Sequence, residues 1–356
     1  MTRFSKLLLN HLLVAGMLLP AAFAGSKESP HDMLAKSFQQ SNLWNQGPVK
    51  MTAKVRLPKG DGTDINLEYA LSWASPDKWR AEWTANGFSQ VTVVNGGKMS
   101  YFSSQPKQLV QLIQMEMAVA ALDGGNPAGA YAVPPLDWDK AKTDATKKKV
   151  NNIDAKCLAL GDPAQSELTY CIDPASDHVL TVSNTIAGAE IGSFEYNDYT
   201  TVGNTSYPQS IKVNYAKTLL EEAKIVVSRT EKFDDKMFVA PDKSTSVDWP
   251  SCPDVEKSFT APHVSKLVPA KESDAALKAK KFGLVWVLAT VGKDGSVTQA
   301  TLIGGDPDLT TAATDAVQQY KYTPYVRCGQ PVQFQQVVVV PFVPPTKKKP
   351  QDDIIG

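Results

Sequence analysis

Four cysteines are the residues whose type and spacing could do chemistry in this sequence: Cys157, Cys171, Cys252 and Cys328. Cysteines either bind a metal such as zinc or pair as disulfides, and a zinc site would need Cys-x-x-Cys spacing or neighbouring histidines. The sequence has neither of these features around its cysteines. We therefore predict two disulfides, with a metal site as the alternative.

The segment around Cys157 and Cys171 favours one of the three pairings that four cysteines allow. Strand-like apolar residues lie on both sides of the turn-forming residues 161–165. If these two strands form a hairpin, the two cysteines lie opposite each other, close enough to bridge. This pairing leaves Cys252 with Cys328, so the second disulfide would tie the interdomain linker to the loop before the last strand.

The other reactive residue types show no catalytic spacing. His31, His178 and His263 have no cysteine or carboxylate partner at a motif spacing. Residues 87–91 lack the final glycine of a nucleophile elbow, and no phosphate-binding glycine loop occurs. Four loop acids are interpreted as solvated turn formers: Asp61, Asp64, Asp137 and Asp139. We predict that the protein is not an enzyme and needs no cofactor, with a catalytic site assembled from distant residues as the alternative.

The charge balance argues against a nucleic-acid partner. The 356-residue chain has 37 Lys and Arg and 37 Asp and Glu, without the clustered basic face that nucleic-acid binding needs. Hydrophobic residues make up 42% and charged residues 21%, as in an ordinary globular protein. This length predicts two domains.

The first residues have the pattern of an export signal. Arg3 and Lys6 precede an apolar run over residues 7–19, and residues 22–24 supply a small-x-small cleavage pattern. We predict a signal peptide over residues 1–24. The alternative is an uncleaved membrane anchor, but the run is shorter than the roughly 20 apolar residues of a spanning helix.

Residues 37–238 have the pattern of a β-rich domain. Alternating runs separated by turn residues predict an antiparallel meander, and a helix over residues 107–122 would cover the apolar face of the sheet. The predicted strands are residues 49–57, 65–73, 79–83, 91–94, 99–102, 156–160, 167–172, 179–186, 191–200, 209–214 and 224–233.

Two segments of this domain resemble the lipoprotein-carrier family of LolA and LolB. Residues 75–82 look like the family's proline-containing turn into a strand, and residues 95–102 look like its glycine hairpin. The resemblance implies a curved half-barrel sheet around an apolar cavity for acyl chains. The residues that would line this cavity are Trp73, Trp79, Trp83, Met115 and Met117, with an ordinary core as the alternative.

The last quarter of the chain predicts a small α+β domain. Five prolines in residues 239–271 predict a semi-extended linker, and residues 272–345 form the predicted domain. A hairpin turns at Asp294-Gly295 between strands at residues 283–288 and 296–303. A helix over residues 309–320 and a last strand over residues 332–342 follow, before a predicted disordered tail at residues 346–356.

This order resembles the C-terminal domain of TonB, the periplasmic energy transducer. The motifs are Asp294-Gly295, the alanine-rich helix, residues 320–324 (Tyr-Lys-Tyr-Thr-Pro) and residues 329–332 (Gly-Gln-Pro-Val). The linker is much shorter than the proline-rich rod of TonB, which puts coupling to an inner-membrane motor in doubt. The resemblance implies a periplasmic protein, anchored in the inner membrane if the leader is not cleaved.

The implied function is docking of an outer-membrane transporter or another envelope protein by addition of a β-strand to the last strand. The residues that would face such a guest are Gln333, Gln335, Val337 and Val339. The alternative is a periplasmic carrier or sensor of a lipid or lipoprotein that uses the cavity of the N-terminal domain.

Overall fold

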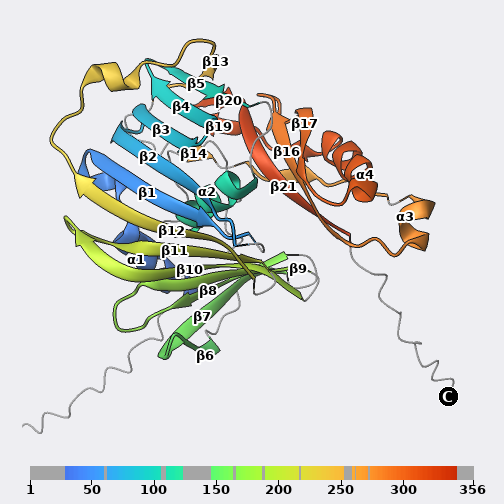
Figure 1. Ribbon diagram of the computed structural model, residues 1–356, viewed down its shortest axis with the longest axis horizontal. Helices are drawn as coiled ribbons and strands as arrows, with labels where there is room; N and C mark the ends of the chain where they lie inside the picture. Colours follow the sequence, from blue (N-terminus) through green and yellow to red (C-terminus); the bar gives the residue numbers. More distant parts are fainter. Residues whose placement is uncertain are drawn as a thin grey trace, which may run out of the picture.

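The structure, a computed structural model, consists of a large curved sheet and a small α+β part that lies beside it (Figure 1). It describes residues 29–59, 62–105, 110–122, 146–162, 166–186, 189–215, 218–251, 259–260, 262–271 and 273–342. The predicted signal peptide and tail lie outside these residues.

The large sheet is antiparallel and has 13 strands within the described residues. Its spatial order is β13-β5-β4-β3-β2-β1-β12-β11-β10-β9-β8-β7-β6. The strands are β1 (Val49–Leu57), β2 (Ile65–Ser75), β3 (Lys78–Ala85), β4 (Phe88–Asn95), β5 (Lys98–Ser103), β6 (Thr146–Val150), β7 (Ile153–Asp162), β8 (Ser166–Ile172), β9 (Val179–Ile186), β10 (Ala189–Val202), β11 (Thr205–Tyr215), β12 (Thr218–Arg229) and β13 (Thr245–Asp248).

Alternation along the strands explains why the sheet has one buried face. In β1, Val49, Met51, Ala53 and Val55 are buried while the residues between them are exposed. Successive side chains of a strand point to opposite faces, so this pattern directs one face of β1 into the core. The predicted half-barrel sheet with a covering helix is confirmed.

Two helices, α1 (Pro30–Ser41) and α2 (Val110–Leu122), pack against the same face of the large sheet. Phe38 of α1 contacts the ring of Tyr170 in β8. The hydroxyl of Tyr196 in β10, on the same face, donates to the carbonyl oxygen of Ala118 in α2 over 2.7 Å. The core of the domain therefore lies between the concave face and these helices.

Part of the predicted linker belongs to the large sheet. Directly before this linker, the 3-10 helix η3 (Asp235–Phe238) packs its Phe238 against Val91 and Val93 of β4. β13 then pairs with β5, with Thr245 opposite Tyr101. The chain thus stays attached to the first domain beyond the predicted domain end, which the proline content did not indicate.

The small part has the predicted β-β-α-β order. Its main sheet has the antiparallel order β17-β16-β21, and α4 covers one face of it with Leu309, Ala313 and Val317. Its elements are α3 (Asp274–Lys278), β16 (Gly283–Val291), β17 (Val297–Gly304), α4 (Pro307–Gln318) and β21 (Phe334–Phe342), with the short strands β14 (Phe259–Thr260), β15 (Val264–Lys266), β18 (Lys321–Tyr322), β19 (Tyr325–Arg327) and β20 (Gln330–Val332).

The predicted hairpin turn at Asp294-Gly295 lies between β16 and β17. Gly295 has a φ of +79°, and a Cβ there would overlap the carbonyl oxygen of Tyr322. The turn therefore requires glycine for both its conformation and its close contact with the chain after α4.

Some predicted boundaries were wrong. The strand predicted over residues 224–233 ends at Arg229, and the strand predicted from residue 332 is interrupted at Gln333, so β20 and β21 are separate. The structure also contains α1 and β6, which the sequence patterns did not predict. β6 has three consecutive lysines and so lacks the apolar alternation that predicts a strand.

Candidate functional site

A small cavity lies between α2 and the large sheet. Its lining is almost entirely apolar and comes from β1, β2, β3, β12 and α2: Met51, Ala53, Tyr69, Trp83, Met115, Glu116, Val119 and Ile225. The cavity volume of about 20 Å³ is enough for a water molecule and too small for an acyl chain. At this size it holds no acyl chain of the kind that the resemblance to LolA and LolB implies.

The predicted cavity residues separate into two groups. Trp83 and Met115 line the cavity. Trp73 and Trp79 are fully buried elsewhere in the core, where the ring of Trp73 lies 5.0 Å from that of Trp44 and 6.5 Å from that of Trp79. Met117 points away from the cavity, toward the small part.

Glu116 is the single ionisable carboxyl in the cavity lining, and the sequence analysis missed it. The indole N–H of Trp83 donates to Glu116 Oε1 over 3.1 Å. Removal from water raises the pKa of Glu116 to about 7, although the hydrogen bond from Trp83 acts in the opposite direction. The signal in the sequence was one acid inside the apolar helix of residues 110–122.

A second acid, Glu221 of β12, is completely buried. Within the described part of the chain, neither of its carboxyl oxygens has a hydrogen-bond partner. Burial raises its pKa to about 9, so the group is a neutral acid at pH 7. Alternation along β12 places Glu221 on the same face as Ile225, which lines the cavity.

One edge of the small sheet is formed by β21, and the other by β17. Among the described residues, β21 pairs with β16 alone, from Phe342 opposite Gly283 to Phe334 opposite Val291. Its second edge therefore has backbone groups without a strand partner in the described chain.

The four residues predicted to face a guest do not share one environment. Gln335 and Val339 are half-buried on β21, and Gln333 lies in the break between β20 and β21. Val337 is 9% exposed and packs against Ile113 of α2. Its side chain is thus part of the contact between the two parts of the molecule.

Arg327 makes a polar contact between the small part and the large sheet. Its side chain is only 2% exposed, and its Nη2 donates to Asp77 Oδ1 over 2.8 Å. Its Nε donates to the carbonyl oxygen of Pro250 over 2.8 Å, and its guanidinium lies 4.8 Å from the ring centre of Trp249. A buried arginine with this set of partners fixes the two parts against each other.

An apolar contact joins the two parts at α2. Ile113 packs with Leu288 of β16 and Val337 of β21 in a separate cluster. Met117, Trp286 and Ile303 surround this cluster. α2 therefore lies between the concave face of the large sheet and the face of the small sheet opposite α4.

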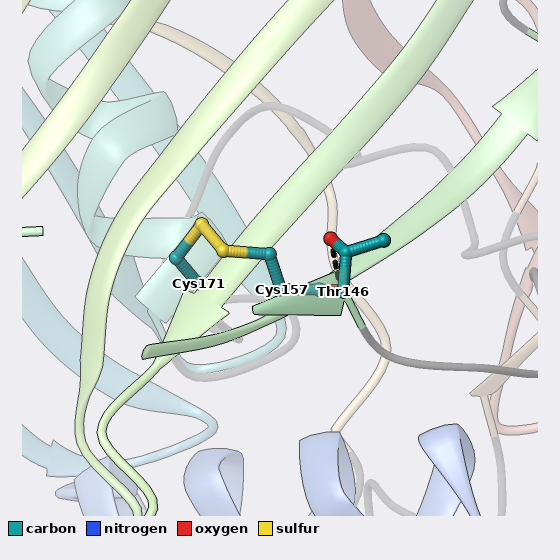
Figure 2. The surroundings of a disulfide bond; sticks show 3 residues. All are labelled: Thr146, Cys157 and Cys171. Atoms are coloured by element: carbon teal, nitrogen blue, oxygen red, sulfur yellow. Dashed lines mark hydrogen bonds between the residues drawn. A yellow bond between two sulfur atoms is a disulfide. The ribbon is translucent and has the colours of Figure 1, made fainter. Parts of the chain in front are cut away.

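Cys157 and Cys171 form the predicted disulfide (Figure 2). They are directly opposite each other on β7 and β8, as the hairpin interpretation requires. The hydroxyl of Thr146 on β6 donates to the carbonyl oxygen of Cys157 over 3.3 Å. The other predicted pair includes Cys252, which lies outside the described residues.

The histidines are placed separately. His178 stacks on the ring of Tyr199 at 3.9 Å, and His263 Nδ1 lies 3.1 Å from the hydroxyl of Thr323. Over the described ranges, no group of three or more His, Cys, Asp or Glu side chains has the arrangement of a metal site. In the same ranges, no helix combines the length and apolar character needed to cross a bilayer.

The small part of the chain is similar to a known family. Residues 273–344 match the family described as Gram-negative bacterial TonB protein C-terminal. The resemblance predicted from the motifs is confirmed. The match covers the sheet β17-β16-β21 and α4, and it does not extend to the large sheet.

Solved structures similar to this chain include two of the LolA type. A LolA superfamily protein from Nitrosomonas europaea is 15% identical, with a TM-score of 0.40, and the match covers 59% of this chain and 97% of that chain. A putative outer membrane lipoprotein-sorting protein domain from Vibrio parahaemolyticus is 11% identical, with a TM-score of 0.37, and the match covers 58% and 94%. No curated protein sequence matches. At these TM-scores the likenesses carry no argument about the fold or the ligands of this protein.

Proposed function

We propose that this protein is a periplasmic docking protein of the TonB type. Its C-terminal domain binds an extended segment of an outer-membrane transporter, or of another envelope protein, by adding that segment to β21. The observation that carries the proposal is that β21 is the edge strand of a sheet that lies within the match to the TonB C-terminal family. We propose binding without catalysis as its activity.

The geometry of β21 suits strand addition. Backbone N–H and C=O groups of an edge strand bind a guest strand, and alternate side chains of the guest then extend the two faces of the sheet. On one face the guest would continue the row of Trp286 and Val339, and on the other the row of Val287 and Val338. Both rows are apolar, so the proposed guest has apolar residues at successive positions.

Titration of the full chain with synthetic peptides tests this proposal. The peptides are periplasm-facing segments of outer-membrane transporters, each also made with backbone N-methyl groups at either its odd or its even positions. Strand addition uses the N–H groups along one side of the guest, so one methylated series should lose binding and the other should retain it. No binding at high micromolar concentration, or equal loss in both series, would contradict the proposal.

A second function, carriage of a lipid or lipoprotein by the large-sheet domain, is favoured by the apolar cavity under α2. Because this cavity is closed to anything larger than water, the carrier would need α2 to move. Native mass spectrometry of the protein purified from cell envelopes tests this function. A bound acyl species supports it, and a protein without any bound species argues against it.

A further inference from the structure

Helix α2 touches two different partners with two different stripes of its surface. Met115, Glu116 and Val119 face the cavity of the large-sheet domain. Ile113 and Met117, one turn apart, face the small sheet. A helix that only covers a sheet does not need the second stripe, which contains Ile113 and Met117. The two stripes therefore indicate that α2 contacts both parts of the molecule.

The sequence of α2 agrees with burial on two sides. Of its residues, only Gln111, Gln114 and Glu116 are polar, and the apolar ones are spread around the helix. A surface helix normally has one apolar stripe, whereas a helix that is apolar all round is enclosed. Ile113 is fully buried, yet it faces away from the cavity. Its burial therefore depends on the small sheet.

The cavity under α2 can accept a ligand only if this helix shifts. Its volume of about 20 Å³ holds no molecule larger than water. The strands β1, β2, β3 and β12 are fixed by their neighbours in the sheet, so α2 is the wall that can move. An outward movement of α2 would press Ile113 and Met117 into Leu288 and Val337. Packed interiors have no free space for such a movement.

We propose that α2 lines the cavity with one side and contacts the small domain with the other, so that its position couples the two. A ligand in the cavity and a small domain packed against α2 therefore exclude each other. The lining specifies the class of ligand: an apolar body with one N–H or cationic group that meets Glu116. Release of the small domain opens the cavity, and an occupied cavity releases the small domain. This coupling goes beyond the docking function and does not depend on whether a strand binds to β21.

The experiment measures binding of the fluorescent dye N-phenyl-1-naphthylamine, an apolar aromatic amine with one N–H group, to the full chain. Arg327→Ala removes the buried polar contact with Asp77 and Pro250 and so favours release of the small domain. Because release increases the fraction of molecules with an open cavity, the dye should bind about tenfold more tightly. Lys293→Ala, which removes only an exposed contact 3.7 Å from Asp248, is the matched control and should change dye affinity less than about twofold.

A second substitution shows where the dye binds. Ala53 lines the cavity, and Ala53→Leu should cancel the gain in affinity when it is combined with Arg327→Ala. Small-angle scattering of each variant reports whether the small domain is detached. If Arg327→Ala does not fold, Leu288→Asp of β16 replaces it, since an acid in the apolar contact with Ile113 also favours release and leaves β21 unchanged.

Two results would overturn the proposal. One is an unchanged dye affinity in a folded variant whose small domain is detached. The other is a gain in affinity that persists with Ala53→Leu, because the dye would then bind the newly exposed surfaces. Peptide titrations at β21 on the same samples report separately on the docking function, so failure of one proposal does not imply failure of the other.

Discussion

The large sheet and the main sheet of the small part have contrasting strands at one of their edges, β6 and β21. The large sheet ends in β6, where Lys147, Lys148 and Lys149 are exposed, and its neighbour β7 is cross-linked to β8 by Cys157–Cys171. The small sheet ends in β21, which has no charged residue and contains four consecutive valines. Lysines on an edge strand disfavour pairing with another chain, and an uncharged apolar edge permits it. The contrast agrees with the proposal that β21, and not β6, is the docking edge.

The largest expected effect concerns the disulfide near the charged edge. Replacing Cys157 and Cys171 together by alanine should lower the free energy of unfolding by about 3 kcal/mol, because the bridge closes a loop with a sequence separation of 14. Urea unfolding measures the change. Peptide binding at β21 is the control and should be unaffected, and a loss of that binding would show that the two ends are not independent.

The next effect comes from Glu221, a buried acid without an equivalent among the described residues of the small sheet's core. Its pKa in the folded state, about 9, lies above the ordinary value of 4.5, so the folded protein holds this proton more tightly than the unfolded chain does. The contribution of Glu221 to the free energy of unfolding is therefore fully present below about pH 4.5 and is lost as the pH rises toward 9. The pKa of Glu116 is also raised, to about 7, so its contribution to the free energy of unfolding is lost in the same way as the pH rises to about 7.

Glu221→Gln tests this pH dependence. Glutamine stays neutral, so the variant should lose less stability than the wild type between pH 6 and pH 9, with a difference of about 1–3 kcal/mol at the upper end. Urea unfolding at both pH values provides the measurement. Glu222→Gln, on the opposite face of β12, is the matched control. Parallel pH profiles for Glu221→Gln and wild type would show that folding does not raise the pKa of Glu221.

A smaller effect is expected from making β21 resemble β6. Gln335 and Gln336 are half-buried, adjacent and already polar, so replacing both by lysine adds charge to the edge without removing an apolar contact. Peptide affinity should fall about tenfold, or about 1.4 kcal/mol. Gln330→Lys on β20, an exposed position, is the control. Unchanged affinity in the double variant would place the guest elsewhere.

The smallest effect is expected at β6 itself. Replacing Lys147, Lys148 and Lys149 by threonine removes the charges that disfavour pairing at this edge. Self-association measured by sedimentation should become detectable at high protein concentration. A variant that remains monomeric to the same concentration as the wild type would mean that β6 is blocked by something other than its lysines.

Local patterns in the sequence predicted much of this structure. The bounds of β1 and β9 agree with the predicted strands, and the Cys157–Cys171 pair follows from a hairpin whose two strands are adjacent in sequence. The helix α4 was evident from the spacing of its buried residues. In each case the pattern that predicts the element lies within it or in the adjacent strand, although β1 also pairs with the distant β12.

The remaining features depend on contacts between distant residues. Arg327 meets Asp77 across 250 positions, and no local pattern distinguishes it from an exposed arginine. The strand β13 is short and forms because β5 offers an edge. Trp83 and Met115 line the cavity and Trp73 and Trp79 lie elsewhere in the core, because strand alternation identifies the buried face and not where a gap in packing lies.

Hydrogen–deuterium exchange of the full chain tests strand addition most directly. With a transporter peptide present, backbone amides along β21 should become protected, while those of β6 keep their exchange rates. Exchange along β21 that stays the same under saturating peptide, or protection that appears at β6 instead, would contradict the assignment of β21 as the docking edge.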